Sequence, residues 1–235
     1  MLIRTAGFAP PQSVDDAIER HLDALGGRAA LARITSRASI GRVTIASAAG
    51  EVTGSIESYA QVPNKSRTVM RLDLSPRGLG EMTIDQRFDG TTGVVINSLQ
   101  GTTDITGDQL EDMRSGTFPS TLMTYKQQGL RADLLPPGSV DGKDAIVISL
   151  KPRRGPAVRM FFDADTHLLV RTVATVVAAQ VGTMDVRTDF SDYRRVGDVL
   201  VAFHTVTSSS LQTVTIAFTD IRDNVPVDDA MFLKK

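Results

Sequence analysis

Apolar and polar residues alternate in two segments of the chain, residues 66–74 (SRTVMRLDL) and 80–88 (GEMTIDQRF). Successive side chains of a β-strand point to opposite sides of the sheet, so this period of two predicts two strands, each with one apolar face. One apolar and one polar face per strand is typical of antiparallel sheets, because parallel sheets are covered on both faces. The residues that these two segments place on one apolar face are Met70, Leu72, Leu74, Met82, Ile84 and Phe88.

Nine further segments have the length and composition of strands and are bounded by turns rich in Gly, Pro, Asp and Ser. We predict these strands at residues 34–46, 51–60, 93–97, 143–150, 157–162, 167–178, 182–190, 199–207 and 211–221. The sequence therefore predicts a mainly β fold of about eleven antiparallel strands. No linker or low-complexity segment divides the strands, so we expect residues 13–235 to form a single domain.

Two regions have helical patterns instead. Apolar residues recur at helical spacing over residues 14–25, and Ser13 before them is a candidate N-cap. Residues 106–130 interrupt the strands, with short helices predicted at 108–113 and 121–128. The apolar side chains of this insertion are Leu110, Met113, Phe118, Leu122 and Met123.

The composition excludes several classes of function. Lys and Arg number 26 and Asp and Glu 27, so there is no basic stripe and we expect no nucleic-acid partner. Cysteine is absent, which excludes disulfides and cysteine-ligated metal ions. The longest apolar stretch, residues 168–181, is interrupted by polar residues and falls short of the ~18 apolar residues that a membrane-spanning helix needs. We expect residues 1–12 to be a disordered or processed N-terminus.

No group of residues forms a catalytic set. Asp163, Asp165 and His167 have the residue types of a metal or acid–base site, but an Asp at a hairpin usually accepts hydrogen bonds from its own turn. His21 and His204 have no second ligand at metal-binding spacing. We therefore expect no enzymatic activity, no metal ion and no cofactor.

Five short motifs follow one another along most of the chain. They are Ala24-Leu25-Gly26-Gly27 after the first helix, Phe88-Asp89-Gly90, residues 162–169 (FDADTHLL), residues 191–194 (SDYR) and residues 224–232 (NVPVDDAMF). In order and spacing, over residues 14–233, they resemble the LolA/LolB-like family of outer-membrane lipoprotein-sorting proteins. The resemblance implies an open antiparallel half-barrel of about eleven strands that wraps around a helix, with helical segments closing its mouth.

The same resemblance implies a carrier in the periplasm that binds lipid or the acyl chains of a lipoprotein. Membrane-associated donor and acceptor proteins are the partners that it implies, and we expect a monomer. LolB is anchored to the membrane through an N-terminal Cys, which this chain lacks, so the soluble carrier LolA is the closer analogy.

A carrier of this kind would hold its ligand on the apolar, concave wall of the half-barrel. Residues 106–130 would then be an apolar lid that competes with the ligand for that wall. Such competition requires that the covered and uncovered conformations of the protein differ by only a few kcal/mol in free energy. The ligand-binding residues that we predict are Met70, Leu72, Leu74, Met82, Ile84, Phe88, Val186, Phe190, Val214, Ile216 and Phe218 on the strands, with Leu110, Met113, Phe118 and Leu122 in the lid.

Two alternatives stay open. At any single position an ordinary filled core explains the same apolar residues. The whole chain is alternatively a non-catalytic structural or interaction module that engages a protein partner through its convex face or an edge strand. An apolar cavity in the concave face would favour the carrier, and a solid core would favour the module.

Overall fold

The computed structural model describes residues 10–153, 155–178 and 182–234. Most of the N-terminus that was predicted to be disordered or processed, residues 1–9, lies outside the described residues. In chain order the strands are β1 (Ser36–Ser47), β2 (Gly50–Gln61), β3 (Lys65–Asp73), β4 (Glu81–Phe88), β5 (Gly93–Asn97), β6 (Gly101–Ile105), β7 (Arg131–Leu134), β8 (Gly138–Val140), β9 (Lys143–Lys151), β10 (Val158–Asp163), β11 (Leu169–Ala178), β12 (Gly182–Val196), β13 (Val199–Ser208) and β14 (Gln212–Asp223).

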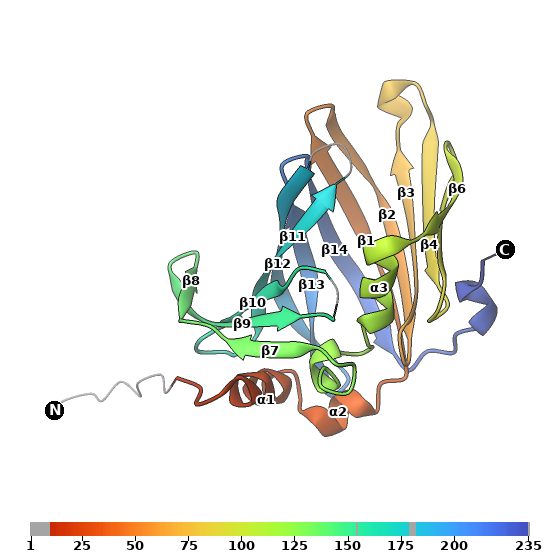
Figure 1. Ribbon diagram of the computed structural model, residues 1–235. Helices are drawn as coiled ribbons and strands as arrows, with labels where there is room; N and C mark the ends of the chain where they lie inside the picture. The colour runs from red at the N-terminus through yellow and green to blue at the C-terminus, as the bar shows by residue number, and fades with distance from the viewer. Residues whose placement is uncertain (1–9, 154, 179–181, 235) are drawn as a thin grey trace.

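Hydrogen bonds join the fourteen strands into one antiparallel sheet (Figure 1). The strand order is β6-β5-β4-β3-β2-β1-β14-β13-β12-β11-β10-β9-β7, and β8 pairs with β9. The two ends of this series, β6 and β7, do not pair with each other, so the sheet is not closed into a barrel. The predicted open, mainly β, antiparallel fold is confirmed.

Three of the fourteen strands, β6, β7 and β8, were not predicted. They have only three to five residues each. In β6 four of the five residues are exposed, so its sequence GTTDI carries no alternation of apolar and polar positions. Such edge strands form through backbone pairing with a longer neighbour, which a periodicity argument does not detect.

The predicted N-terminal helix is confirmed as α1 (Val14–Ala24), and the Ser13 side chain accepts a hydrogen bond from the Asp16 N–H at 3.1 Å. A second helix, α2 (Arg28–Ala32), follows directly. The insertion contains α3 (Gly107–Ser115), but the second helix predicted at 121–128 is reduced to one 3₁₀ turn, η2 (Thr121–Met123). Two further 3₁₀ turns are η1 (Ser75–Arg77) and η3 (Asp229–Phe232).

The two apolar clusters formed by the described residues lie on the same face of the sheet. Two residues that pair across neighbouring antiparallel strands have their side chains on the same side of the sheet. A row of such pairs across several strands therefore marks one face. One such row runs through Ile148, Met160, Thr172, Thr188, Thr207, Val214, Ile45 and Val52. Because Ile148 belongs to one cluster and Val52 to the other, we call this the inner face and the opposite side the outer face.

The lower core fills one end of the inner face. Here α1, α2 and the segment around η2 pack against β9, β10 and β13. Ile18, Leu22 and Phe162 are no more than 1% exposed, and each contributes about 1.5–3 kcal/mol by its removal from water. This end of the half-barrel is a solid core.

Two glycines allow neighbouring strands to approach closely in the middle of the sheet. A Cβ at Gly54 on β2 would lie 1.9 Å from the Arg71 carbonyl oxygen, and a Cβ at Gly41 on β1 would lie 2.4 Å from the Ala217 carbonyl oxygen. Glycine within a strand is associated with tight bends of this kind. The two positions lie beside the upper part of the inner face, where the sheet must curve.

The C-terminal segment covers the outer face of β3 and β4. Phe232 of η3 is 1% exposed, and Asp229 forms an ion pair of 2.8 Å with Lys65. On the same side Asp85 is 7% exposed and accepts hydrogen bonds from the guanidinium groups of Arg67 and Arg87. The tail therefore fixes the outer side of these strands and leaves the inner side free.

Candidate ligand-binding site

The upper part of the inner face contains an apolar pocket of about 420 Å³. This volume falls within the range of about 300–1,000 Å³ that is typical of small-molecule sites. Strands β1 to β4 and β14 supply its walls. The residues that line it are Ile45, Ser47, Val52, Met70, Leu72, Leu74, Arg77, Met82, Ile84, Gln212 and Val214. We call it the upper pocket.

Strand register explains why these side chains meet. Ile45 pairs with Val52 on β2 and with Val214 on β14, which places all three on the inner face. Leu72 pairs with Met82 in the same way. Leu72 is buried at 2% exposure and forms the base of the pocket, whereas Met82 is half-buried and borders its open space. The strands therefore leave an apolar wall that the chain itself does not fully cover.

Six of the predicted ligand-binding residues line this pocket, and two more pack against the same cluster behind it. The six are Met70, Leu72, Leu74, Met82, Ile84 and Val214, and the two are Ile216 and Phe218. The structure thus brings together seven positions on β3, β4 and β14 and an eighth, Leu74, directly after β3.

A polar band separates the upper pocket from the lower part of the inner face. Ser39 on β1 pairs with Ser58, and Ser58 pairs with Thr68, whose hydroxyl oxygen lies 3.3 Å from that of Ser58. Farther around the sheet the hydroxyl oxygens of Thr188 and Thr207 lie 3.0 Å apart. Within each of these two bonded pairs one hydroxyl can donate to the other, so the polar side chains lie on the inner face at little cost and the apolar residues form two separate clusters.

The predicted lid covers a different part of the inner face. Met113, Phe118 and Phe88 border a smaller cavity of about 220 Å³ between α3 and the sheet. Figure 1 shows α3 in front of the sheet, below the hairpin tips. Leu122 is 3% exposed and belongs to the lower core, and Leu110 is half-buried on α3. None of residues 106–130 lines the upper pocket.

Val186 and Phe190 on β12 share the inner face with the other predicted positions but lie outside the upper pocket. Phe190 pairs with Thr205, which pairs with Ile216, so these three residues share the inner face. Neither Val186 nor Phe190 lines the upper pocket. Phe190 borders a pocket that opens mainly on the outer face.

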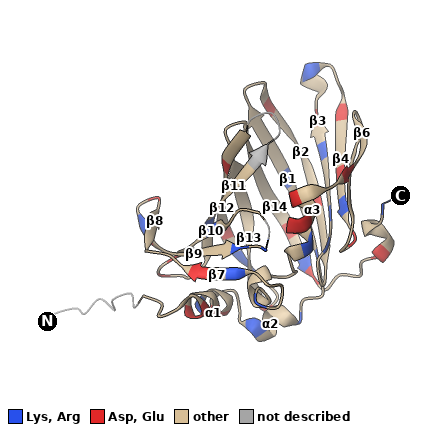
Figure 2. Cartoon of the chain, viewed as in Figure 1, with Lys and Arg blue, Asp and Glu red and all other residues tan. Residues whose placement is uncertain are grey.

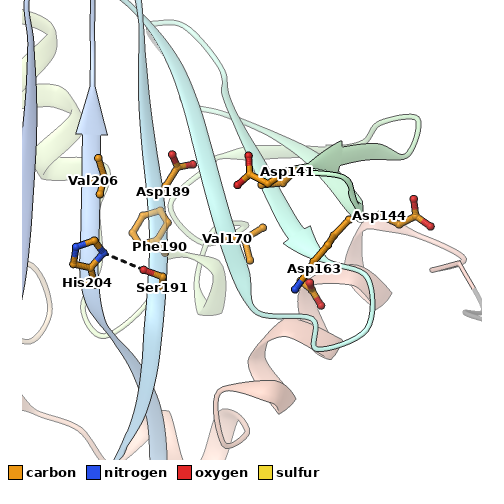
Figure 3. A pocket seen from close by; sticks show the side chains of 11 residues that line it. Asp141, Asp144, Asp163, Val170, Asp189, Phe190, Ser191, His204 and Val206 are labelled. Atoms are coloured by element: carbon orange, nitrogen blue, oxygen red, sulfur yellow. Dashed lines mark hydrogen bonds between the residues drawn. The ribbon is translucent and has the colours of Figure 1, made fainter.

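This outer pocket has a volume of about 380 Å³ and is lined by carboxylates and by Ser191 and His204 (Figure 3). The Ser191 hydroxyl lies 3.1 Å from Nδ1 of His204. A nucleophile and base of this type need a third group that orients the histidine, and within the described residues His204 has no other hydrogen bond. Arg171 bonds the carboxylates of Asp141 and Asp189. Two of the carboxylates that line this pocket are therefore held in an ion-pair network by Arg171.

The Asp163 motif forms a turn, as its sequence predicts. One carboxylate oxygen of Asp163 accepts hydrogen bonds from the backbone N–H of Asp165 at 3.1 Å and from the N–H and hydroxyl of Thr166 at 2.8 and 2.9 Å. These bonds lower the pKa of Asp163 against the opposing effect of burial. In the part of the chain that the structure describes, no cluster of His, Asp and Glu could hold a metal ion.

Two arginines of the inner face were not singled out from the sequence. Arg77 lies at the rim of the upper pocket and is the one charged residue that lines it within the described chain. Arg37 on β1 is bonded to Asp223 and lies over the ring of Phe118. Arg77 follows Pro76 in a 3₁₀ turn outside the alternating strands, so no periodic signal marks it. The partners of Arg37 are distant in the sequence.

The architecture is shared with solved structures of very different sequence. A domain from Vibrio parahaemolyticus named as an outer membrane lipoprotein-sorting protein superimposes with a TM-score of 0.62 at 12% identity, over 93% of this chain and 97% of that one. A LolA superfamily protein from Nitrosomonas europaea gives 0.60 at 11% identity, over 94% and 98%. The fold is LolA-like. A DUF1329 family protein from Desulfovibrio piger shares this LolA-like fold, with a TM-score of 0.61 at 12% identity over 96% and 98% of the two chains.

These similarities concern the fold and confirm the resemblance to LolA-like proteins at that level. No family model matches the sequence, and no curated protein matches it. Among the helices of the described residues, none has the length and apolar character needed to cross a membrane.

Proposed function

We propose that this protein is a periplasmic carrier that binds an apolar ligand, a lipid or the acyl chains of a lipoprotein, in the upper pocket. The single observation that carries the proposal is that one end of the inner face is a solid core while the other end is an apolar pocket of about 420 Å³. The LolA-like fold, which occurs in a protein named for lipoprotein sorting, supports the same class of cargo. The carrier would act as a single domain over residues 13–235 and as a monomer, without enzymatic activity or cofactor.

Apolar burial supplies the affinity. Each buried methylene contributes about 0.8 kcal/mol, and a water-sized group occupies about 30 Å³. A pocket of this volume therefore accommodates roughly a dozen methylene groups, which contribute about 10 kcal/mol before the cost of immobilising the ligand. Methionines at Met70 and Met82 suit ligands of variable shape, because an unbranched thioether side chain adapts to them.

The insertion 106–130 would be the movable cover. No residue of α3 is fully buried, and the helix is tied to the sheet by few polar contacts. Arg114 donates to the Thr91 carbonyl at 2.8 Å, and Asn64 donates to the Arg114 carbonyl at 3.4 Å. A helix held in this way can move as a unit. Its displacement would expose the cavity beside Phe88 and extend the apolar wall that the upper pocket offers.

Loading and unloading would involve membrane-associated donor and acceptor proteins. The ligand pocket lies on the inner face, whereas the outer face carries the C-terminal segment and the polar pocket, so a partner can contact the outer face or an edge strand without blocking the ligand. If the protein were instead an interaction module without a ligand, it would use only the outer face or an edge strand, and the upper pocket would have no role.

A matched pair of variants tests the carrier. Met82→Trp adds an indole to the upper pocket, whereas Thr83→Trp adds one on the opposite face of the same strand. We expect native mass spectrometry of the wild type and of Thr83→Trp to detect a co-purified lipid, and a fluorescent acyl probe to bind both. Met82→Trp should bind the probe at least tenfold more weakly. A lipid-free wild type that also fails to bind the probe would leave the interaction module as the function.

A further inference from the structure

We propose that the upper pocket is built for a single-chain amphiphile with a carboxylate head, a long-chain fatty acid anion, whose head is held by Arg77 at the rim. This inference rests on the proposed function, because it assumes that the pocket takes an acyl chain. It adds which class of acyl ligand binds and in which orientation.

The charge distribution of the pocket carries the argument. Eleven residues line it, and Arg77 is the one that is charged. No carboxylate lies among them, so the wall presents one positive charge and no negative charge to a ligand. The other polar positions, Ser47 and Gln212, lie at the ends of β1 and β14 beside the same rim. The rest of the wall is aliphatic or thioether.

Arg77 is held in place and still has free donors. One terminal nitrogen donates to the Ala49 carbonyl at 2.9 Å, which ties the turn η1 to the hairpin tip between β1 and β2. In Figure 2 a blue stretch lies at the tip of the connection between β3 and β4, the connection that contains η1. A guanidinium has five N–H donors, and this is its one hydrogen bond within the described residues. The remaining donors match the two oxygens of a carboxylate in a bidentate arrangement.

Two acidic residues, Asp73 and Glu81, lie four positions from Arg77 in the sequence, and they pair with each other on the outer face of β3 and β4. The Asp73 carboxylate accepts hydrogen bonds at Ser75, including the Ser75 N–H at 2.9 Å. These hydrogen bonds lower the pKa of Asp73, so the carboxylate stays ionised and engaged within the turn. The exposed guanidinium of Arg77 is therefore available to an external anion.

The volume of the pocket favours one chain over two. About 420 Å³ accommodates roughly a dozen groups of methylene size, as estimated from about 30 Å³ for each. A single positive charge is matched by the single negative charge of a carboxylate, whereas a phosphate monoester carries about two. When the acyl chain lies in the pocket and the carboxylate head lies at the rim, no charge is buried.

Binding of cis-parinaric acid and of its methyl ester tests the proposal, because the two probes share a chain and differ in charge. The protein has no tryptophan, so probe fluorescence is read without interference from indole. We expect the wild type to bind the acid roughly tenfold or more tightly than the ester, the range of a charge-assisted hydrogen bond. Arg77→Gln should abolish this preference and leave the affinity for the ester unchanged. Arg77→Glu should make the acid the weaker ligand.

Arg42→Gln is the matched control, because Arg42 is exposed on the outer face of β1. It should retain the full preference for the acid. Equal binding of acid and ester by the wild type would overturn the role of Arg77 while leaving the carrier intact. Failure of both probes to bind would instead overturn the proposed function. Displacement of the acid by lysophosphatidic acid at tenfold lower concentration would show that the head is a phosphate and that the carboxylate assignment is wrong.

Discussion

The guanidinium of Arg37 lies 5.6 Å from the centroid of the Phe118 ring and is bonded through the same group to the carboxylate of Asp223. Arg37 and Asp223 are partners on β1 and β14, so the pair is fixed to the sheet. Phe118 follows α3 in the insertion, and its N–H donates to the Pro63 carbonyl at 2.7 Å. The insertion is therefore attached to the inner face at Phe118, whereas α3 before it has no buried residue.

Loss of this attachment should loosen the insertion. Phe118→Leu keeps an apolar side chain but removes the cation–π contact, which is worth about 0.5–2 kcal/mol. We expect hydrogen exchange of residues 107–117 to become several-fold faster and the release of a bound acyl probe to accelerate by a similar factor. Hydrogen exchange with mass spectrometry and stopped-flow fluorescence measure the two effects.

Phe118→Tyr is the control for this change, since it retains the ring over Arg37. It should exchange and release as the wild type does. A Phe118→Leu protein with unchanged exchange over 107–117 would mean that the contact does not hold the insertion.

Truncation of the pocket base should cost stability and change selectivity. Leu72 is 2% exposed, and its replacement by Ala removes buried methylenes beside an existing cavity. We expect the free energy of unfolding to fall by about 2–4 kcal/mol, as for other buried leucines. The enlarged pocket should also favour acyl chains that are longer by several methylenes.

Leu99→Ala provides the comparison, because Leu99 is 53% exposed. Denaturant titration should place this variant within about 0.5 kcal/mol of the wild type. If Leu72→Ala were equally neutral, the upper cluster would not be part of the folded core.

Acid should destabilise the protein through His21. Burial in the lower core lowers the pKa of His21 from 6.5 to about 4, although its hydrogen bond to the His167 carbonyl opposes this shift. Between these two pKa values the unfolded chain binds a proton that the folded protein does not. The free energy of unfolding should therefore decrease as the pH falls from about 6.5 to about 4, by about 3 kcal/mol in total.

His21→Gln removes the titrating group and should flatten the pH dependence of stability over this interval. The variant will itself be less stable, because His21 also contacts the Phe162 ring at a centroid distance of 4.7 Å. The slope, rather than the absolute stability, is the readout. An unchanged slope in His21→Gln would assign the acid sensitivity to other groups.

A buried ion pair and an exposed one should differ greatly in their effect on stability. Burial alone would raise the pKa of Asp85, but hydrogen bonds from Arg67 and Arg87 lower it below its usual range. Asp85→Asn would leave two largely buried guanidinium groups without a countercharge, and we expect a loss of about 2–4 kcal/mol. Asp198→Asn removes a pair whose side chains are 63% and 75% exposed and should change stability little. Thermal unfolding of the two variants measures both effects, and similar losses of stability in the two would contradict the prediction.

Local signals in the sequence were enough to predict the principal elements. Ser13 does cap α1, and the alternation in residues 66–74 and 80–88 does place Leu72 and Met82 on one face. These features depend on neighbours within a few residues, which a periodicity argument can read. Short edge strands such as β6 depend on a distant partner and were missed.

The division of the inner face into a solid core and a pocket was not predictable in the same way. It depends on a row of hydroxyl residues that only strand register brings together, such as Ser39, Ser58 and Thr68. It also depends on α1 and Leu122 packing at one end only. Arg77 was missed because a turn residue at a pocket rim has no pattern that distinguishes it from other surface arginines.

The unpaired ends of the sheet, β6 and β7, have a mechanical consequence. In a closed barrel the number of strands and the stagger of their hydrogen-bond register fix the diameter. Here no hydrogen bond links the first strand of the series to the last, so the shell can uncoil slightly and widen while every ladder between neighbours stays intact. Ligands of different width can then be accommodated by a change in the curvature of the sheet, without a change in the register of any strand pair.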